Sequence, residues 1–296
     1  MRRLALFAVI GIWPAFLAAQ APFDSAQRAR ECSNCAVWNV PQRPFRIFGN
    51  TYYVGTHGLS VILITSPKGH VLIDGALPES APQILANIRA LGFRTEDVKR
   101  ILNSHAHFDH AGGIGPLSAA TGATVLASPW SAKVIESGEP LRDDPQFGLI
   151  LPYPRAERVK TIADGEVVKV GDLEVVAHFT GGHTPGGTTW TWQACEASRC
   201  LHVVYADSQT PVSNDDFRFA KSAAAAAFER SFDVLDHLGC DILVTPHPSA
   251  STFFERIAAR DAGDTTSLTD REACRRLAAD ARRQLAARIT KENGGH

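Results

Sequence analysis

Residues 98–113 read VKRILNSHAHFDHAGG, and this stretch carries the strongest signal in the chain. Val98 to Leu102 predicts a short strand. Within the next eight residues come four side chains of the types that bind metals: His105, His107, Asp109 and His110. A pair of glycines follows and lets the backbone turn tightly. Four polar groups with no task are not expected between a buried strand and a glycine turn, so the stretch indicates a metal site.

The spacing inside this cluster favours two neighbouring cations over one. In extended backbone, alternation places His105 and His107 on the same side, while Asp109 and His110 lie farther round the turn. One short loop is not expected to complete two coordination shells. Further ligands must therefore come from distant segments.

Two histidines in turn-forming segments are the candidates. His183 lies in TGGHTPGG, residues 180–187, just after a strand expected to end at Phe179. His247 follows the expected strand Ile242 to Val244, and a proline on each side stiffens its backbone. We predict that one zinc binds His105, His107 and His183, and that a second binds Asp109, His110 and His247. The remaining histidines are interpreted as surface or hydrogen-bonded residues: His57, His70, His178, His202, His237 and His296.

The rest of the chain predicts strands and helices in both halves. Short β-rich runs from residue 45 to 74 predict an antiparallel meander, followed by a helix that a capping-box pattern, Ser80-Ala81-Pro82-Gln83, would open. The second half predicts strands over 166–170 and 173–179, a hairpin around Trp190 and two helices, at about 222–238 and 267–289. No linker-like break separates the halves. The pattern favours one α/β sandwich of two sheets covered by helices.

Composition and charge set limits on location and partners. The chain has 296 residues, 45% of them hydrophobic, and a formal net charge of −1, so it can bury a core but lacks the basic surface that nucleic acids require. Arg2 and Arg3, the apolar run Leu4 to Leu17 and small residues up to Ala19 predict a signal peptide over residues 1–19 and a mature domain over 20–296. No later stretch is apolar enough to span a membrane. We expect a periplasmic or secreted monomer.

Six cysteines in an exported chain indicate disulfides. Cys195 and Cys200 flank a short polar connection between two expected strands and could close a hairpin. Cys240 and Cys274 could attach the charged helical tail to the core. For Cys32 and Cys35 a local disulfide is our interpretation, and half of a structural zinc site is the alternative.

The motif His105-Ala106-His107-Phe108-Asp109-His110 resembles the HxHxDH signature of the metallo-β-lactamase fold superfamily, an αββα sandwich with metals at the ends of its sheets. Together with Gly182-His183-Thr184-Pro185-Gly186, Ala206-Asp207-Ser208 and Thr245-Pro246-His247-Pro248, it makes the chain similar to subclass B3 of the metallo-β-lactamases. The similarity extends over nearly the whole mature chain and includes the placing of Cys240 and Cys274.

The resemblance implies roles for further residues. It carries the six ligands over to the positions assigned above, with Ser208 where other subclasses place a ligand cysteine. Ser208 and Thr210 match positions whose hydroxyls meet the substrate carboxylate, and Gln146 is expected on a loop over the cleft. Asp207 matches a metal-bridging residue of other hydrolases on this fold, but we expect it to support a ligand instead. The chain lacks the tyrosine that some members carry near residues 211–214.

The activity that the resemblance implies is zinc-dependent hydrolysis of the β-lactam amide bond, carbapenems included, by a metal-bound hydroxide, with Asp109 orienting the water. The expected partner is a small-molecule β-lactam. Two alternatives stay open at this point. One is a lactone or thioester hydrolase on the same fold, and the other is a metal-binding protein without turnover.

Overall fold

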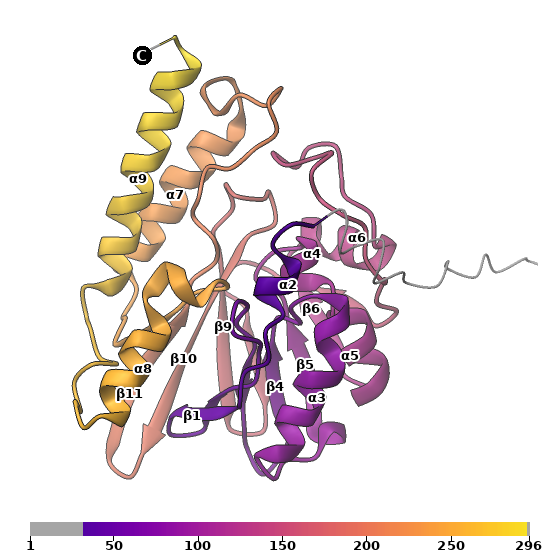
Figure 1. The fold of residues 1–296 in the computed structure, drawn as a ribbon, viewed down its shortest axis with the longest axis vertical. Coiled ribbons are helices and arrows are strands. Elements are labelled where there is room, and N and C mark those ends of the chain that lie inside the picture. Colours follow the sequence, from indigo (N-terminus) through magenta and orange to yellow (C-terminus); the bar gives the residue numbers. More distant parts are fainter. Residues whose placement is uncertain (1–31, 295–296) are drawn as a thin grey trace, which may run out of the picture.

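The computed structural model describes residues 32–294, and it confirms an αββα sandwich (Figure 1). The predicted signal peptide lies outside the described residues. Within residues 32–294, no helix is both long and apolar enough to cross a membrane.

The first sheet has seven strands in the order of the chain, β1 to β7. The predicted meander forms its antiparallel part, with strands β1 (Phe45–Phe48), β2 (Thr51–Tyr53), β3 (Ile62–Ile64) and β4 (His70–Ile73). The parallel part consists of β5 (Val98–Leu102), β6 (Thr124–Ala127) and β7 (Val159–Thr161). The connections between the parallel strands are helical, as such crossovers require: α3 (Ala81–Ala90), α4 (Phe108–Ala111), α5 (Ile114–Thr121) and α6 (Pro129–Ser137).

The second sheet has five strands in the order β12-β11-β10-β9-β8. Strands β8 (Val167–Val170), β9 (Leu173–Phe179), β10 (Thr188–Glu196) and β11 (Arg199–Tyr205) are antiparallel. Strand β12 (Ile242–Val244) pairs with β11 in parallel after the helix α7 (Ala223–His237). The sandwich is completed by α8 (Phe253–Asp261) and α9 (Ala273–Glu292), and Figure 1 shows α7 and α9 alongside each other.

Three buried apolar clusters hold the four layers together. Ile62, Ile73 and Trp190 belong to the cluster between the two sheets. Ile84 and Leu117 belong to a second cluster, which joins the first sheet to its helices. The third cluster packs α7 and α9 on the second sheet and includes Phe228 and Phe232. Because both sheets are covered, the ends of their strands are the places where polar loops can gather.

Two local predictions were wrong in detail. Ser80 precedes α3, but within the described chain its side chain caps no backbone N–H; its Oγ donates instead to Asn39 Oδ1 at 2.6 Å. A 3₁₀ turn, Pro78–Ser80, leads into the helix, so Ser80 has helical backbone angles and is badly placed to cap. The last helix begins at Ala273 rather than near residue 267, because a series of turns occupies the residues before it.

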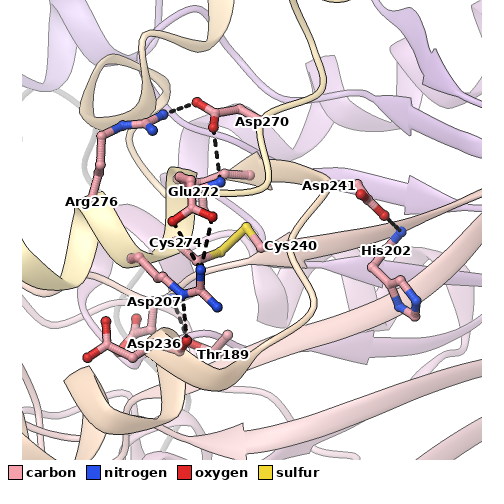
Figure 2. Close-up of a disulfide and its surroundings, with 12 residues drawn as sticks. Thr189, His202, Asp207, Asp236, Cys240, Asp241, Asp270, Glu272, Cys274 and Arg276 are labelled. Carbon is pink, nitrogen blue, oxygen red and sulfur yellow. Dashed lines mark hydrogen bonds and ion pairs between the residues drawn. A yellow bond between two sulfur atoms is a disulfide. The ribbon is translucent and has the colours of Figure 1, made fainter.

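All three cysteine pairs form disulfides: Cys32–Cys35, Cys195–Cys200 and Cys240–Cys274. The second joins β10 to β11 opposite each other in register. The third attaches the start of α9 to the segment before β12 (Figure 2). The pairing of Cys32 with Cys35 excludes the alternative of a structural zinc site there.

Candidate metal centre

The loop after β5 is held in a defined shape by a buried carboxylate. Asp74 accepts hydrogen bonds from Ser104 N at 2.7 Å and Ser104 Oγ at 2.6 Å, and from the Tyr205 hydroxyl at 2.8 Å. Gly113 can approach Gly75 closely because it has no side chain; a Cβ there would lie 2.1 Å from the Gly75 carbonyl oxygen. The turn that carries the histidine cluster is therefore fixed on both sides.

His105, His107 and His183 converge from both sheets. The first two follow β5 of the first sheet, and His183 follows β9 of the second. One ring nitrogen from each lies within 4.8 Å of the others, and all three residues are buried. Ring centroids are 4.8 Å apart for His105 and His107, and 5.0 Å apart for His107 and His183. We call these three residues the three-histidine group.

Each histidine of this group is oriented by a hydrogen bond from its other nitrogen. His105 Nδ1 lies 2.8 Å from Asp207 Oδ1, and His107 Nε2 lies 3.1 Å from Asp144 Oδ2. His183 Nδ1 lies 2.8 Å from the Thr210 carbonyl oxygen. Such contacts set the ring orientation and leave the opposite nitrogen free to coordinate.

Asp109, His110 and His247 form a second group of candidate ligands, with ligand atoms again within 4.8 Å of one another. We call it the aspartate group. His247 Nε2 and His110 Nε2 each lie 3.2 Å from Asp109 Oδ2. His247 follows β12 in the second sheet, so this group also spans both sheets. The Trp38 ring lies 5.2 Å from the His247 ring, centroid to centroid.

The charge states suit a cation. Burial, together with the neighbouring His107, lowers the pKa of His183 to about 3, and burial with His110 and His107 lowers the pKa of His105 well below its usual value. Burial alone would raise the pKa of Asp109, but the His110 and His247 rings outweigh it and hold that pKa well below its usual value. His105 and His183 thus offer neutral imidazole lone pairs, and Asp109 offers a carboxylate, which are the forms that bind metals. Burial alone would lower the pKa of His247, but the Asp109 carboxylate outweighs it and raises that pKa, so a cation there would displace a proton from that ring.

Unpartnered nitrogens provide a direct test of fit. Among the described residues, His105 Nε2 and His110 Nδ1 are buried and have no hydrogen-bond partner, and His110 Nε2 is buried with only the Asp109 carboxylate near it, at 3.2 Å. Leaving such groups buried and unsatisfied costs about 1–3 kcal/mol each. Imidazole nitrogens that converge in this way fit the coordination preference of Zn²⁺, and the six residues fit two such ions.

The residues of both groups line a cavity of about 430 Å³. Gln146, Ser208 and Thr210, all predicted to contact substrate, line it. Gln146 Nε2 lies 3.3 Å from His183 Nε2. Asp207 contacts the outward nitrogen of His105, which agrees with the supporting position expected for it. The histidines interpreted as unrelated to the site lie outside both groups, except His296, which is not among the described residues.

Sequence reasoning missed several residues at the cavity. Asp144, which orients His107, stands two positions before Gln146 in DDPQF and could have been found by asking which carboxylates accompany the ligands. Trp38 and the disulfide-closed turn at Cys32 form one wall, while Leu149 and Val212 are exposed at the rim. No pattern in the sequence connects Cys32, Trp38, Leu149 or Val212 to the cluster.

Comparison with known proteins agrees with this geometry. A model of the metallo-beta-lactamase superfamily matches residues 54–196. The structure of Rm3 metallo-beta-lactamase is 50% identical to this chain, with a TM-score of 0.86, and the match covers 88% of this chain and 99% of Rm3. This chain belongs to the metallo-β-lactamase family. MEM-A1, a subclass B3 metallo-β-lactamase from a soil metagenome library, is 48% identical with a TM-score of 0.85, covering 88% of this chain and all of MEM-A1. The family member described here therefore falls in subclass B3.

Curated relatives match over shorter stretches. An N-acyl homoserine lactonase from Bacillus cereus is 30% identical in a match that covers 19% of this chain. The chain spans about a third of that lactonase, 32% of its length. This match reflects a part of the metallo-β-lactamase fold that hydrolases of different substrates share.

Proposed function

We propose that this chain is a zinc-dependent β-lactamase that opens the β-lactam amide bond, carbapenems included, with two zinc ions. The observation that carries the proposal is that six candidate ligands from both sheets converge in the lining of one cavity. The 50% identity to Rm3 metallo-beta-lactamase over nearly the whole of that protein supports the substrate class.

The donor set determines what zinc would do here. When bound, zinc provides a hydroxide at neutral pH and polarises the carbonyl under attack. His105, His107 and His183 would hold one ion, and Asp109, His110 and His247 the other. Asp109 stays ionised because of its low pKa, so its carboxylate can accept a hydrogen bond from the attacking water and orient it.

The cavity walls would position the substrate. The hydroxyls of Ser208 and Thr210 reach the cavity and can donate hydrogen bonds to the carboxylate that β-lactam drugs carry. Gln146, next to His183, can contact the substrate from the opposite loop. Thr210 also orients His183 through its carbonyl oxygen, so substrate binding and ligand orientation depend on the same segment.

The position of Asp207 argues against the lactone and thioester alternative. A carboxylate that bridges two metals must lie between the two groups, whereas Asp207 Oδ1 faces the outward nitrogen of His105. The three disulfides support an exported protein, because such bonds persist in oxidising compartments. We expect the enzyme to act as a monomer.

The test is hydrolysis of a chromogenic cephalosporin and of a carbapenem by the zinc-loaded protein, with and without a chelator, beside a lactone and a thioester. We expect turnover of both β-lactams, its loss on chelation, and near loss in His107→Ala. His178→Ala is the matched control, since this histidine bonds to Thr191 Oγ1 and lies outside both groups.

Three outcomes would count against the proposal. β-Lactam turnover that neither chelation nor His107→Ala changes would exclude the zinc mechanism. Faster turnover of the lactone or thioester would favour the alternative substrates. Two zinc ions per chain without turnover of any substrate would favour a metal-binding protein.

A further inference from the structure

The cavity is bordered by two loops that come from different halves of the chain. One loop, residues 143–149, carries Gln146 and Asp144; the other, residues 208–214, carries Ser208 and Thr210. Each loop also orients a candidate ligand, His107 through Asp144 and His183 through Thr210. The distance between these loops therefore sets the width of the cavity, whereas each of the two histidines is oriented by a contact with one loop alone.

Asn214 joins the two loops. Asn214 N donates to the Pro145 carbonyl oxygen at 2.9 Å, and Asn214 Nδ2 donates to the Phe147 carbonyl oxygen at 2.8 Å. These two carbonyls stand on either side of Gln146. Asn214 therefore holds the backbone both before and after the residue expected to contact substrate.

The other end of the Asn214 side chain is also occupied. Its Oδ1 accepts hydrogen bonds from Asp216 N at 3.0 Å and from Phe217 N at 2.8 Å. The amide group thus has one acceptor fixed within its own turn and one donor reaching across to the other loop. Asn214 does not line the cavity within the described chain, so it has no contact with substrate to offer.

The preceding residue, Ser213, connects the same turn to the helix α9. Arg288 Nη2, on α9, donates to Ser213 Oγ at 2.7 Å. Arg288 also pairs with Glu292, whose carboxylate accepts from the backbone of Phe219 and Ala220. Ser213 thus holds the turn to the outer helix, while Asn214 holds it to the loop of Gln146.

We propose that Asn214 is a positioning residue that sets the gap between the two cavity loops, and that substrate binding depends on it more than the chemical step does. The inference rests on the proposed function, because it takes the cavity to bind β-lactams. The Asn214 side chain acts through Gln146, Ser208 and Thr210 and leaves the candidate ligands themselves in place.

The experiment compares Asn214→Ala and Asn214→Asp with Ser213→Ala in the zinc-loaded, full-length mature protein. In Asn214→Asp, one carboxylate oxygen can still accept from Asp216 N and Phe217 N, while the other faces the Phe147 carbonyl and cannot donate to it. This variant therefore removes the side-chain hydrogen bond between the loops. Ala removes both roles. Both variants keep the backbone bond to Pro145. Ser213→Ala removes the contact with α9 and the hydrogen bond from Ser213 Oγ to the Asn214 carbonyl oxygen, but it leaves the hydrogen bonds to residues 143–149 in place.

We expect Asn214→Ala and Asn214→Asp to raise KM about fivefold to tenfold, with kcat within about twofold of the wild type. Zinc content should stay unchanged, and hydrogen exchange of the amides in residues 143–150 should become faster in both. Ser213→Ala should leave KM and that exchange at the wild-type level.

If Asn214→Asp kept the wild-type KM and the wild-type rate of hydrogen exchange in residues 143–150, the proposal would be overturned. The only role of the Asn214 side chain would then be to accept from Asp216 N and Phe217 N. The proposal would also be overturned if Asn214→Ala lost zinc, or if its kcat fell while its KM stayed at the wild-type value. A wild-type protein that hydrolyses no β-lactam would refute the proposed function, while the exchange of residues 143–150 would still decide whether Asn214 joins the loops.

Discussion

The two groups of candidate ligands lie next to each other but are supported differently. In the three-histidine group every outward nitrogen has a hydrogen-bond partner: Asp207, Asp144 or the Thr210 carbonyl. In the aspartate group, by contrast, the His110 ring nitrogens make no hydrogen bond within residues 32–294 and have only the Asp109 carboxylate nearby, 3.2 Å from Nε2. The His247 side chain is 29% exposed. Behind His247 lie the Trp38 ring and the Gly58 backbone, which forms a hydrogen bond with the His247 ring, rather than a carboxylate.

This difference predicts a difference in metal affinity. Ligands that hydrogen bonds already hold in place lose little conformational freedom on binding an ion, whereas a partly exposed ligand must be ordered by the ion. We therefore expect the three-histidine group to bind its zinc more tightly, and the aspartate group to lose its zinc first on dilution or mild chelation.

The largest expected effect comes from removing one ligand of each group in turn. His183→Ala should lower kcat/KM at least about 1000-fold, because it opens the group that polarises the substrate. His247→Ala should lower it about 10- to 100-fold, since water can replace a partly exposed ligand. The measurement is kcat/KM at increasing zinc concentration. Only His247→Ala should recover part of the lost activity as zinc is added. Equal losses without recovery would show that the two groups are equivalent.

A smaller effect is expected from the carboxylate behind His107. Asp144→Ala should lower zinc affinity or kcat/KM about 10- to 100-fold, because the ring loses the partner that orients it. Asp144→Asn is the control, since an amide oxygen can still accept from Gln146 N, as Asp144 Oδ1 does at 2.8 Å. If Asp144→Ala kept full zinc affinity by titration calorimetry, the preorganisation of the three-histidine group would not depend on these contacts.

The smallest effect is expected at Trp38. Trp38→Ala should weaken binding of the second zinc about fivefold, the scale of one aromatic contact, and should leave the first zinc unaffected. Trp38→Phe should lose less because it keeps a ring against His247. Stepwise zinc titration separates the two ions, and an equal loss for both would show that Trp38 does not act through His247.

The convergence of the candidate ligands and most of the strands could be predicted from sequence, because their signals are local. The cluster at residues 105–110 is dense, and His183 and His247 each follow a recognisable strand within a turn. Strand β9 was predicted to the residue, because Leu173–Phe179 alternates between buried and more exposed positions and ends at polar loops.

The supporting residues could not be predicted, because their roles come from contacts between distant segments. Asp144 is 37 residues from His107, and Asp207 is 102 residues from His105. Nothing near Trp38 in the sequence indicates that its ring would lie against His247. The helix α5 was not identified because its amphipathic pattern is weak. The helices α6 and α8 are amphipathic, and sequence reasoning overlooked them.

Each ligand group takes residues from both sheets, and this has a consequence for folding. A cation in either place would tie the ends of β5 to the ends of β9 or β12 across the middle of the sandwich. An ion at 1000 times its dissociation constant adds about 4 kcal/mol to the stability of the state that binds it. The metal supply of the surroundings would then govern how long the protein survives heat and proteases, apart from any effect on its chemistry.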